Sequence, residues 1–131
     1  MGNVSFAKMQ QISPLIRATY DLFSVHKILT ESRSDIQFSD FRKRSIGRKY
    51  YQIDNWKGFC FIADNNEIGF YIKKQYQSNG LATKAASELI AKEIRPYYFA
   101  TIKDSNSASQ KVIEKLGFIP KGTLWGLDRK A

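Results

Sequence analysis

The sequence has little cysteine, no long apolar run and no targeting signal, and each absence excludes a class of protein. Among its 131 residues Cys60 is the only cysteine, so neither an internal disulfide nor a cluster of thiolate metal ligands can form. No stretch of 18 apolar residues predicts a membrane span. The first residues lack the basic and then apolar pattern of a secretory signal. We therefore expect a single cytoplasmic domain over residues 1–131, with Cys60 as a buried, inert thiol.

Motifs of several enzyme classes are also missing. The sequence has no Walker P-loop, no Gly-x-Gly-x-x-Gly after a first strand, and no Ser-His-Asp, Cys-His or metal-ligand pattern, so we expect no metal. His26, the only histidine, falls within a predicted helix, where we interpret it as a surface residue. Only 12 acidic residues stand against 21 Lys and Arg, for a net charge of +9. This excess favours an anionic partner: a phosphorylated cofactor, a nucleic acid or an acidic substrate.

The first third of the chain is predicted to hold a strand and two helices. Residues 3–9 predict a short strand. Residues 13–30 predict a helix, because a serine N-cap precedes a proline at the first helical position and apolar residues follow at helical spacing. A second, shorter helix is predicted over 37–47, with Ser39 as its N-cap and Gly47 as its stop.

The remainder predicts a sheet with further helices. Aromatic and β-branched runs separated by turn residues predict an antiparallel meander over 48–74. A helix over 81–94, a strand over 97–102, a helix over 105–117 and an extended piece over 118–127 follow. This order predicts an α/β (α+β mixed) fold: a mixed, mostly antiparallel sheet with about four helices and a short C-terminal end. The predicted apolar faces of the two later helices consist of Ala82, Ala85, Ala86, Leu89 and Ile90, and of Ala108, Val112, Ile113 and Leu116.

The stretch "YQSNGLATKA", residues 76–85, carries the first functional motif. A polar turn leads from a predicted strand directly into a helix, whose first N–H groups and dipole attract an anion. Gly80 would let a phosphate approach the backbone, and Ala82 keeps the next approach small. The polar side chains that could add hydrogen bonds are Gln77, Ser78, Asn79 and Thr83. The turn is therefore either a pyrophosphate cradle without a Walker lysine or an ordinary strand-to-helix loop.

A second motif lies one predicted strand further on, at "NSASQKVIEKLGF", residues 106–118. With both motifs in view, the sequence resembles the GNAT acyl-CoA N-acyltransferases. Their cofactor signature, Gln/Arg-x-x-Gly-x-Gly/Ala, is matched by Gln77, Gly80 and Ala82. Their later signature, an Asn that opens a helix ending in Lys-Leu-Gly-Phe, is matched by Asn106, Ser109 and Lys115 to Phe118. The resemblance covers 67–118 and is closest to the branch that includes ribosomal-protein N-terminal acetyltransferases, whereas 3–66 agree in element order only.

The resemblance implies a GNAT-like fold that binds acetyl-CoA in a V-shaped gap between two splayed parallel strands, here 67–74 and 97–103. The pantetheine arm would pair with the first strand like an added strand, and the pyrophosphate would lie on 78–83. Lys111 would face the adenosine phosphate, although a solvated helix-face lysine is the alternative. The cofactor-binding residues implied are Phe70, Tyr71, Ile72, Gln77, Ser78, Asn79, Gly80, Leu81, Ala82, Thr83, Asn106, Ser109 and Lys111.

The implied activity is transfer of an acetyl group from acetyl-CoA to a primary amine of a small molecule, a nucleotide sugar or a peptide N-terminus. Strand alternation puts Glu67, Gly69 and Tyr71 on one face, which would be the face toward the acceptor cleft unless a bulge changes the parity. Glu67 is then the candidate base, with a solvated hairpin-end carboxylate as the alternative. Tyr71 and Tyr76 could donate to the leaving thiolate, with ordinary packing as the alternative. Many members carry a tyrosine seven residues after the helix-opening Asn, but here that position is Ile113. The catalytic candidates are Glu67, Tyr71 and Asn106.

The acceptor is indicated only by charge. Five basic residues, Arg42, Lys43, Arg44, Arg48 and Lys49, fall where the family borders its acceptor cleft, which suits an acidic acceptor, although a solvated helix face is the alternative. Two other functions stay open: a catalytically weak acyl-CoA-binding protein, and a basic nucleic-acid-binding module.

The C-terminal end predicts an open sheet edge. The family adds two strands after its Gly-Phe helix end, and residues 118–131 are too few for two strands, a turn and a polar tail. The edge of 97–103 would then be covered either by 122–127 of the same chain or by a second copy. We favour a homodimer through this region, with Trp125 as an apolar anchor.

Overall fold

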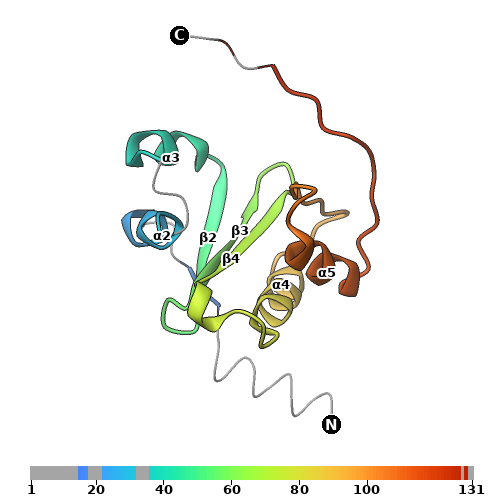
Figure 1. Ribbon diagram of the computed structural model, residues 1–131, viewed down its shortest axis with the longest axis horizontal. Helices are drawn as coiled ribbons and strands as arrows, with labels where there is room; N and C mark the ends of the chain where they lie inside the picture. The colour runs from blue at the N-terminus through green and yellow to red at the C-terminus, as the bar shows by residue number, and fades with distance from the viewer. Residues whose placement is uncertain (1–14, 18–21, 32–35, 128, 130–131) are drawn as a thin grey trace.

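The computed structural model describes residues 15–17, 22–31, 36–127 and 129. A four-stranded antiparallel sheet in the order β1-β2-β3-β4 lies between two pairs of helices, α2 with α3 on one face and α4 with α5 on the other (Figure 1). This arrangement confirms the mixed fold with four helices and an antiparallel sheet. The elements are β1 (Leu15–Arg17), α2 (Leu22–Leu29), α3 (Phe38–Arg44), β2 (Arg48–Ile53), β3 (Gly58–Ala63), β4 (Ile68–Ile72), the 3-10 turn η1 (Lys74–Tyr76), α4 (Leu81–Lys92) and α5 (Ser107–Lys115).

The first predicted helix, over 13–30, is wrong in its first half. Leu15–Arg17 form β1 and pair antiparallel with β2, in the register Leu15 with Ile53. Main-chain pairing to a sheet edge therefore replaces helical hydrogen bonds there, and α2 begins only at Leu22. The strand predicted over 3–9 lies outside the described residues.

The second predicted helix exists but is shorter than expected. Gln37, not Ser39, is the N-cap of α3, since the Phe41 amide bonds to the Gln37 carbonyl at 3.0 Å. The helix ends at Arg44, and Gly47, with φ +81°, belongs to the turn before β2. His26 of α2 is half-buried rather than a surface residue, because its Nε2 lies 2.8 Å from the Ile36 carbonyl oxygen.

The predicted meander over 48–74 is confirmed as β2, β3 and β4. The register between β3 and β4 is regular from Gly58 opposite Ile72 to Ile62 opposite Ile68. Alternate residues therefore face opposite helical layers. One core lies toward α4 and α5 and is built on Tyr51, Ile53, Cys60, Ile62, Ile68, Ile72, Ala85, Leu89 and Ile113. The other lies toward α2 and α3 and is built on Val25, Ile28, Ile36, Phe41, Tyr50 and Phe59.

Cys60 lies fully inside the first of these cores, as expected for an inert thiol. Burial raises its pKa, with a smaller contribution from the nearby carboxylate of Glu88. The thiol therefore stays protonated at neutral pH and acts as an apolar packing group.

The predicted strand over 97–102 is mostly wrong. Only Phe99 joins the sheet, through an isolated parallel bridge to Glu67 at the start of β4. Residues 100–103, which follow Phe99, are not assigned to a strand. Beyond this bridge, no described strand therefore pairs with the free edge of β4.

The later helices occupy the predicted places. In α4 the predicted face is confirmed: Ala85, Ala86 and Leu89 are buried, with Ala82 and Ile90 packed against the same core. In α5 only Ile113 is buried, and Ala108 is exposed, so that face is narrower than predicted.

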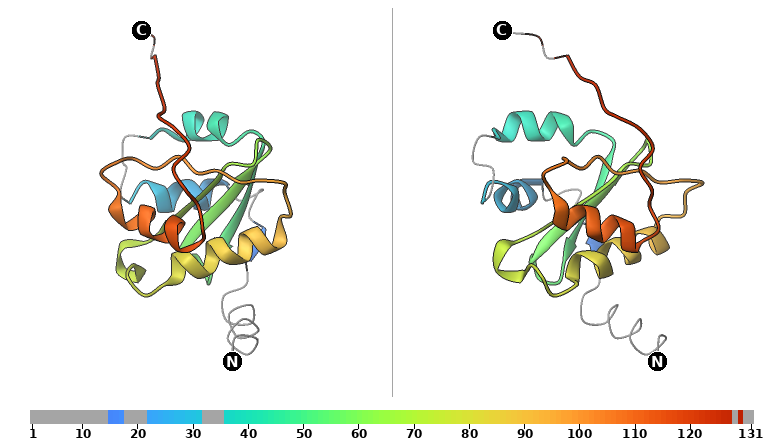
Figure 2. Two further views of the ribbon diagram at one scale, coloured as in Figure 1. Left: turned by 90° about the vertical axis from the view of Figure 1, so that its right-hand side faces the viewer. Right: turned by 45° about the vertical axis from the view of Figure 1, so that its right-hand side comes forward.

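After α5 the described residues 118–127 form neither helix nor strand, and the segment leaves the body of the molecule in both views of Figure 2. It does not pair as a strand beside 97–103, so the intramolecular alternative for covering that edge is wrong. None of the helices in the described part of the chain is long and apolar enough to cross a membrane.

Candidate active site

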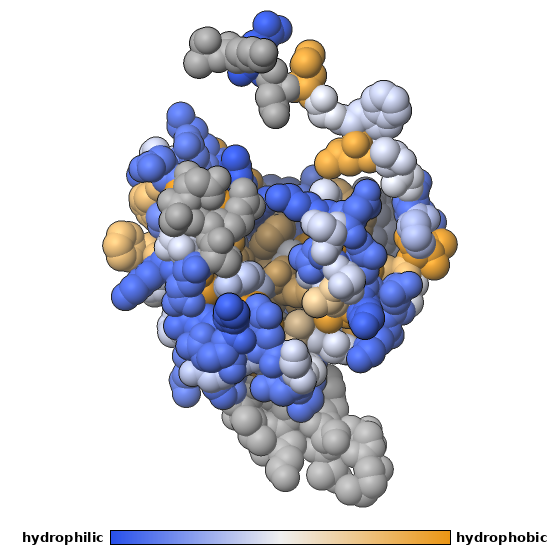
Figure 3. All heavy atoms as spheres, viewed as in Figure 1, coloured by the Kyte–Doolittle hydropathy of each residue, from blue (hydrophilic) through white to orange (hydrophobic). Residues whose placement is uncertain are grey.

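A cleft of about 530 Å³ opens between β4 and the segment that leaves it. Figure 3 shows a hollow on this side of the molecule, with apolar atoms inside it and hydrophilic side chains around it. The walls combine three parts of the chain: the α2–α3 layer with β2 and β3, the strand β4, and residues 100–109. Its lining residues that bear on function are Arg44, Arg48, Glu67, Phe70, Tyr71, Lys103, Asn106 and Ser109.

The cleft exists because two segments part at one point. The Ile68 amide donates to the Phe99 carbonyl at 2.8 Å, and the Phe99 amide donates to the Asn66 carbonyl at 3.2 Å. Past this pair, β4 continues along β3 while 100–103 diverges. The cleft lies where the resemblance implied a gap between parallel strands 67–74 and 97–103, but in the second segment only Phe99 pairs, through an isolated parallel bridge to Glu67.

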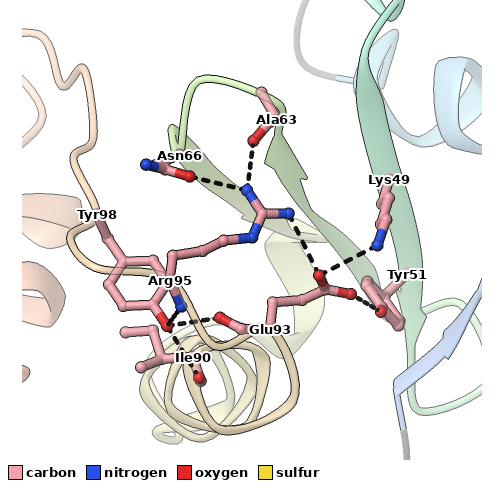
Figure 4. Close-up of polar contacts among 8 residues, drawn as sticks. All are labelled: Lys49, Tyr51, Ala63, Asn66, Ile90, Glu93, Arg95 and Tyr98. Carbon is pink, nitrogen blue, oxygen red and sulfur yellow. Dashed lines mark hydrogen bonds and ion pairs between the residues drawn. The ribbon is translucent and has the colours of Figure 1, made fainter.

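A polar network holds this branch point (Figure 4). The Arg95 guanidinium donates to the Ala63 carbonyl at 3.2 Å and to Oδ1 of Asn66 at 2.8 Å, which ties the end of α4 to the turn before β4. The Tyr98 hydroxyl donates to the Glu93 carbonyl at 2.5 Å. These contacts fix the turn that carries Glu67.

The carboxylate of Glu93 is the centre of that network. It accepts from the Tyr51 hydroxyl at 2.5 Å, from Lys49 Nζ at 3.3 Å and from Arg95 at 3.3 Å. Partial burial acts to raise the pKa of Glu93, but these three donors outweigh it and hold the pKa below its ordinary value. The charged form therefore stabilises the branch point.

The predicted strand parity of β4 is confirmed. Ile68 and Ile72 belong to the core under α4 and α5, and Tyr71 packs on the opposite core, with its ring centroid 6.1 Å from that of Phe59. Glu67 and Tyr71 both line the cleft. Phe70 lines it too, whereas Ile72 is buried in the core and does not.

Gly69 makes room in this wall. A Cβ at this position would lie 2.2 Å from a ring carbon of Phe61. The glycine therefore lets the Phe61 ring lie across β4, where the ring forms part of the cleft.

The predicted anion turn lies at the other end of β4. Gly80 is the N-cap of α4 with φ +82°, and a Cβ there would meet nothing within 4 Å. Its backbone is thus open to an external group. Asn79 Oδ1 accepts from the Leu81 amide at 3.3 Å, and Gln77 Nε2 donates to the Ile72 carbonyl at 2.8 Å. These two side chains shape the turn, and the remaining first-turn amides keep their usual lack of intrahelical partners.

The other predicted turn residues divide between exposure and packing. Ser78, with φ +71°, is exposed, and Thr83 is half-buried. Leu81 and Ala82 pack partly on the core. None of the residues 77–83 lines the cleft beside Glu67, because the turn lies beyond the far end of β4.

Asn106 has a clear structural task. It is the N-cap of α5, and its Oδ1 accepts from the Ser109 amide at 3.1 Å. The cap does not use its amide NH₂ group, which carries two donors. Asn106 and Ser109 both line the cleft, while Lys111 is exposed and does not.

The basic cluster splits across the sheet. Arg44 and Arg48 line the cleft. Arg42 and Lys43 are exposed outside it, and Lys49 points to the opposite face, where it pairs with Glu93 at 3.3 Å. Strand alternation separates Arg48 from Lys49, so only part of the predicted rim is present.

Residues 16–119 match the model of the acetyltransferase (GNAT) domain family. The chain belongs to the GNAT family. A curated relative, the uncharacterized N-acetyltransferase YjdG of Bacillus subtilis strain 168, is 35% identical over 81 residues, covering 56% of this chain and 48% of the relative. The chain therefore spans about half the length of the curated relative it matches.

Two solved structures have the same fold as this GNAT chain. The microcin C7 self-immunity acetyltransferase MccE, in complex with acetyl-CoA and AMP, is 15% identical with a TM-score of 0.61, covering 88% of this chain and 83% of that one. The apo ribosomal L7/L12 α-N-protein acetyltransferase RimL is 16% identical with a TM-score of 0.58, covering 82% and 78%. At these identities the likeness establishes the fold.

Sequence reasoning missed several residues of this cleft. Phe61, Thr101 and Lys103 line the cleft, and Glu93 and Arg95 hold its branch point. Their places depend on contacts between distant segments, such as the 32 residues between Arg95 and Ala63, so no local pattern could have identified them.

Proposed function

We propose that this chain transfers an acetyl group from acetyl-CoA to a primary amine by direct attack in a ternary complex. The observation that carries the proposal is the convergence of Glu67, Tyr71 and Asn106 on one cleft at the point where β4 and 100–103 part. Family membership makes acetyl transfer the reaction class to test first.

The residues present fit the cosubstrate. An exposed turn with an open Gly80 backbone precedes α4, a helix of 12 residues whose dipole favours a pyrophosphate at its N-terminus. The Asn106 amide and the edge of β4 would hold the pantetheine arm. When bound, the thioester supplies the acetyl group and leaves as the CoA thiolate.

The chain's own groups then have two tasks. Glu67, or a water that it orients, takes a proton from the acceptor ammonium, because only the neutral amine attacks. The new C–N bond forms as the C–S bond breaks, and the thiolate requires a proton. Tyr71 lines the cleft on the strand that follows Glu67, and we assign the supply of this proton to its hydroxyl.

The usual acid position offers no alternative donor. Ile113 occupies it, and its side chain is 9% exposed within the core shared with Leu89. Because an apolar side chain occupies this position, the proton for the thiolate must come from elsewhere: from Tyr71 or from solvent.

Thermal unfolding with acetyl-CoA, plain CoA and single-stranded RNA tests the binding step. We expect both CoA forms to raise the melting temperature and RNA to leave it unchanged. Release of free thiol from acetyl-CoA over a panel of primary amines then tests turnover. Stabilisation without turnover would indicate an acyl-CoA-binding protein, and stabilisation by RNA alone would overturn the proposal.

A further inference from the structure

Arg48 is the best-organised charged group of the cleft, and its guanidinium is held on two sides. Its central carbon lies 4.0 Å from the centroid of the Phe61 ring, and Nη1 donates to the Tyr50 hydroxyl at 3.1 Å. The Tyr50 side chain is fully buried, and its hydroxyl lies 2.9 Å from Ser45 Oγ. The position of the arginine is therefore set before any ligand arrives.

This arginine has no counter-charge within the described part of the chain. The ion pairs there join Lys49, Lys57, Lys73 and Arg95 to carboxylates, and neither Arg44 nor Arg48 takes part. A guanidinium carries five N–H donors in a planar fork, and the Tyr50 contact uses one of them. The remaining donors match the geometry of a carboxylate or a phosphate.

The charge balance of the cleft also favours an anionic ligand. Its described lining includes the cations Arg44, Arg48 and Lys103 and the single carboxylate of Glu67. A positive cleft with apolar walls concentrates anions. The walls beside Arg48 are aromatic: Phe41, Tyr50, Phe59, Phe61 and Tyr71.

The cosubstrate's pyrophosphate does not explain this feature. Arg48 pairs with Ala63 across the sheet, near the start of β4, whereas the Gly80 turn follows the end of β4. The four residue steps from Ile68 to Ile72 alone span about 13 Å. Arg48 instead lies at the end of the strand where Glu67 lies.

We propose that Arg48, assisted by Arg44, binds an anionic group of the acceptor, so that the acceptor is a primary amine with an apolar body and a carboxylate or phosphate. The inference rests on the proposed acetyl transfer and narrows its substrate class. The amine would lie near Glu67, the apolar body against the aromatic wall, and the anion on the guanidinium fork.

Two matched pairs of aromatic amines test the proposal. The first is 4-(aminomethyl)benzoate against 4-(aminomethyl)benzamide, which differ in one carboxylate. The second is tyramine phosphate against tyramine, which differ in one phosphate. We expect kcat/KM to be about 10- to 100-fold higher for the anionic member of at least one pair, the size of a charged hydrogen-bonded contact. The pair with the larger ratio identifies the anion.

The variant that tests the residue is Arg48→Met, which keeps an apolar side chain over Phe61 and removes the fork. It should reduce the ratio within the favoured pair to about one, mainly by lowering kcat/KM for the anionic member. Arg48→Lys should restore part of the ratio, because it keeps charge without the bidentate geometry. The matched control is Lys92→Gln, an exposed α4 lysine outside the cleft, which removes the same charge and should leave the ratio unchanged.

Two further measurements keep the outcome decisive. If Arg48→Met fails to fold, Arg44→Gln replaces it, since Arg44 is exposed and should lower the ratio by a smaller factor. Calorimetry of the four amines in the presence of CoA reports anion preference without turnover. Equal affinity and equal kcat/KM within both pairs would overturn the inference while leaving acetyl transfer intact. A chain that neither binds CoA nor acetylates any amine, yet binds the anionic members through Arg48, would overturn the proposed function and not the anion site.

Discussion

Glu67 lies where the main chain of β4 begins, between the turn fixed by Arg95 and the bridge to Phe99. If it is the base, Glu67→Gln should lower the rate of acetyl transfer by roughly 10²–10⁴-fold near neutral pH. The loss should shrink as the pH approaches the pKa of the acceptor amine, since more of that amine is then already neutral. Steady-state rates from pH 6 to 10 measure the effect.

The matched control for this substitution is Glu114→Gln, which neutralises an exposed carboxylate on α5 outside the cleft. Its pH profile should overlay that of the wild type. A Glu67→Gln enzyme with the wild-type profile would show that water or the acceptor itself performs the deprotonation.

Gly80 permits a second test at the scale of one residue. Gly80→Asp and Gly80→Asn have the same shape, and both residue types tolerate the left-handed backbone better than most. They differ in one negative charge beside the expected pyrophosphate. We expect Gly80→Asp to weaken acetyl-CoA binding at least tenfold more than Gly80→Asn, measured by calorimetry on folded proteins. Equal affinities would show that the pyrophosphate of acetyl-CoA does not bind at this turn.

Among single residues, those in local motifs were predictable and those in tertiary contacts were not. Gly80 and Asn106 were placed at helix starts from the sequence, and both are N-caps. Arg48 and Lys49 read as one basic rim, yet the sheet sends them to opposite faces. Applying strand alternation to 48–53, as it was applied to 67–72, would have separated them.

At the scale of elements, the meander was predictable because its strands are short, aromatic and separated by turns, and they pair with neighbours in sequence. The two errors involve pairing at long range. Leu15–Arg17 pair with residues 34 or more positions away, and among the described residues the 97–102 segment has no strand partner beyond the bridge at Phe99. Local propensity favours helix for the first and strand for the second, and tertiary contacts decide both.

The junction of α4 with β2 makes a prediction about pH. Glu93 has a pKa below its ordinary value, so its contribution to stability is complete above the ordinary carboxyl range and is lost as the pH falls through the lower, folded-state pKa. Glu93→Gln should destabilise the fold by about 1–3 kcal/mol at pH 7, through weakened charged hydrogen bonds. The difference from wild type should diminish below about pH 4. Urea unfolding across pH measures it, and Glu114→Gln again serves as the exposed control.

The contact between β4 and β3 at Gly69 links packing to specificity. Gly69→Ala places a methyl group against the Phe61 ring, which must then move away from its place under Arg48. We expect a loss of about 1–3 kcal/mol of stability and a smaller preference for anionic amines. Denaturation and the matched amine pairs report the two effects.

A second-site change separates these effects. Phe61→Leu in the Gly69→Ala background should recover stability, because the shorter side chain accepts the methyl group. It should not recover anion preference, because the aromatic platform is gone. Gly126→Ala, where an added Cβ meets nothing within 4 Å, is the control for a glycine substitution. Recovery of both properties by Phe61→Leu would show that the ring has no part in placing Arg48.

At the scale of the whole molecule, residues 119–127 expose apolar side chains along a segment without helix or strand. Leu124 is 81% exposed, Trp125 88% and Leu127 93%. The segment 100–103 has no strand paired to it in the described part of the chain. We propose that the C-terminal segments of two copies cover this edge for each other, with Trp125 as the anchor.

Sedimentation at micromolar concentration tests the pairing of copies. We expect a dimer for the full chain and a monomer when residues 122–131 are deleted, with acetyl-CoA affinity retained within about threefold. Trp125→Ala should weaken the dimer more than Lys121→Ala, an exposed neighbour of the same segment. A monomer for the full chain over the whole concentration range would refute the proposal.

The position of Trp125 gives the protein a built-in optical reporter. The chain has two tryptophans, and Trp56 is half-buried against the α2–α3 core while Trp125 lies outside it. In Trp56→Phe the remaining fluorescence reports the C-terminal segment alone. Emission typical of a water-exposed indole, readily quenched by iodide, would mark the free segment. If the segment becomes buried as the protein concentration is raised, the Trp125 emission should shift to shorter wavelength and iodide should quench it less. The measurement needs no attached dye.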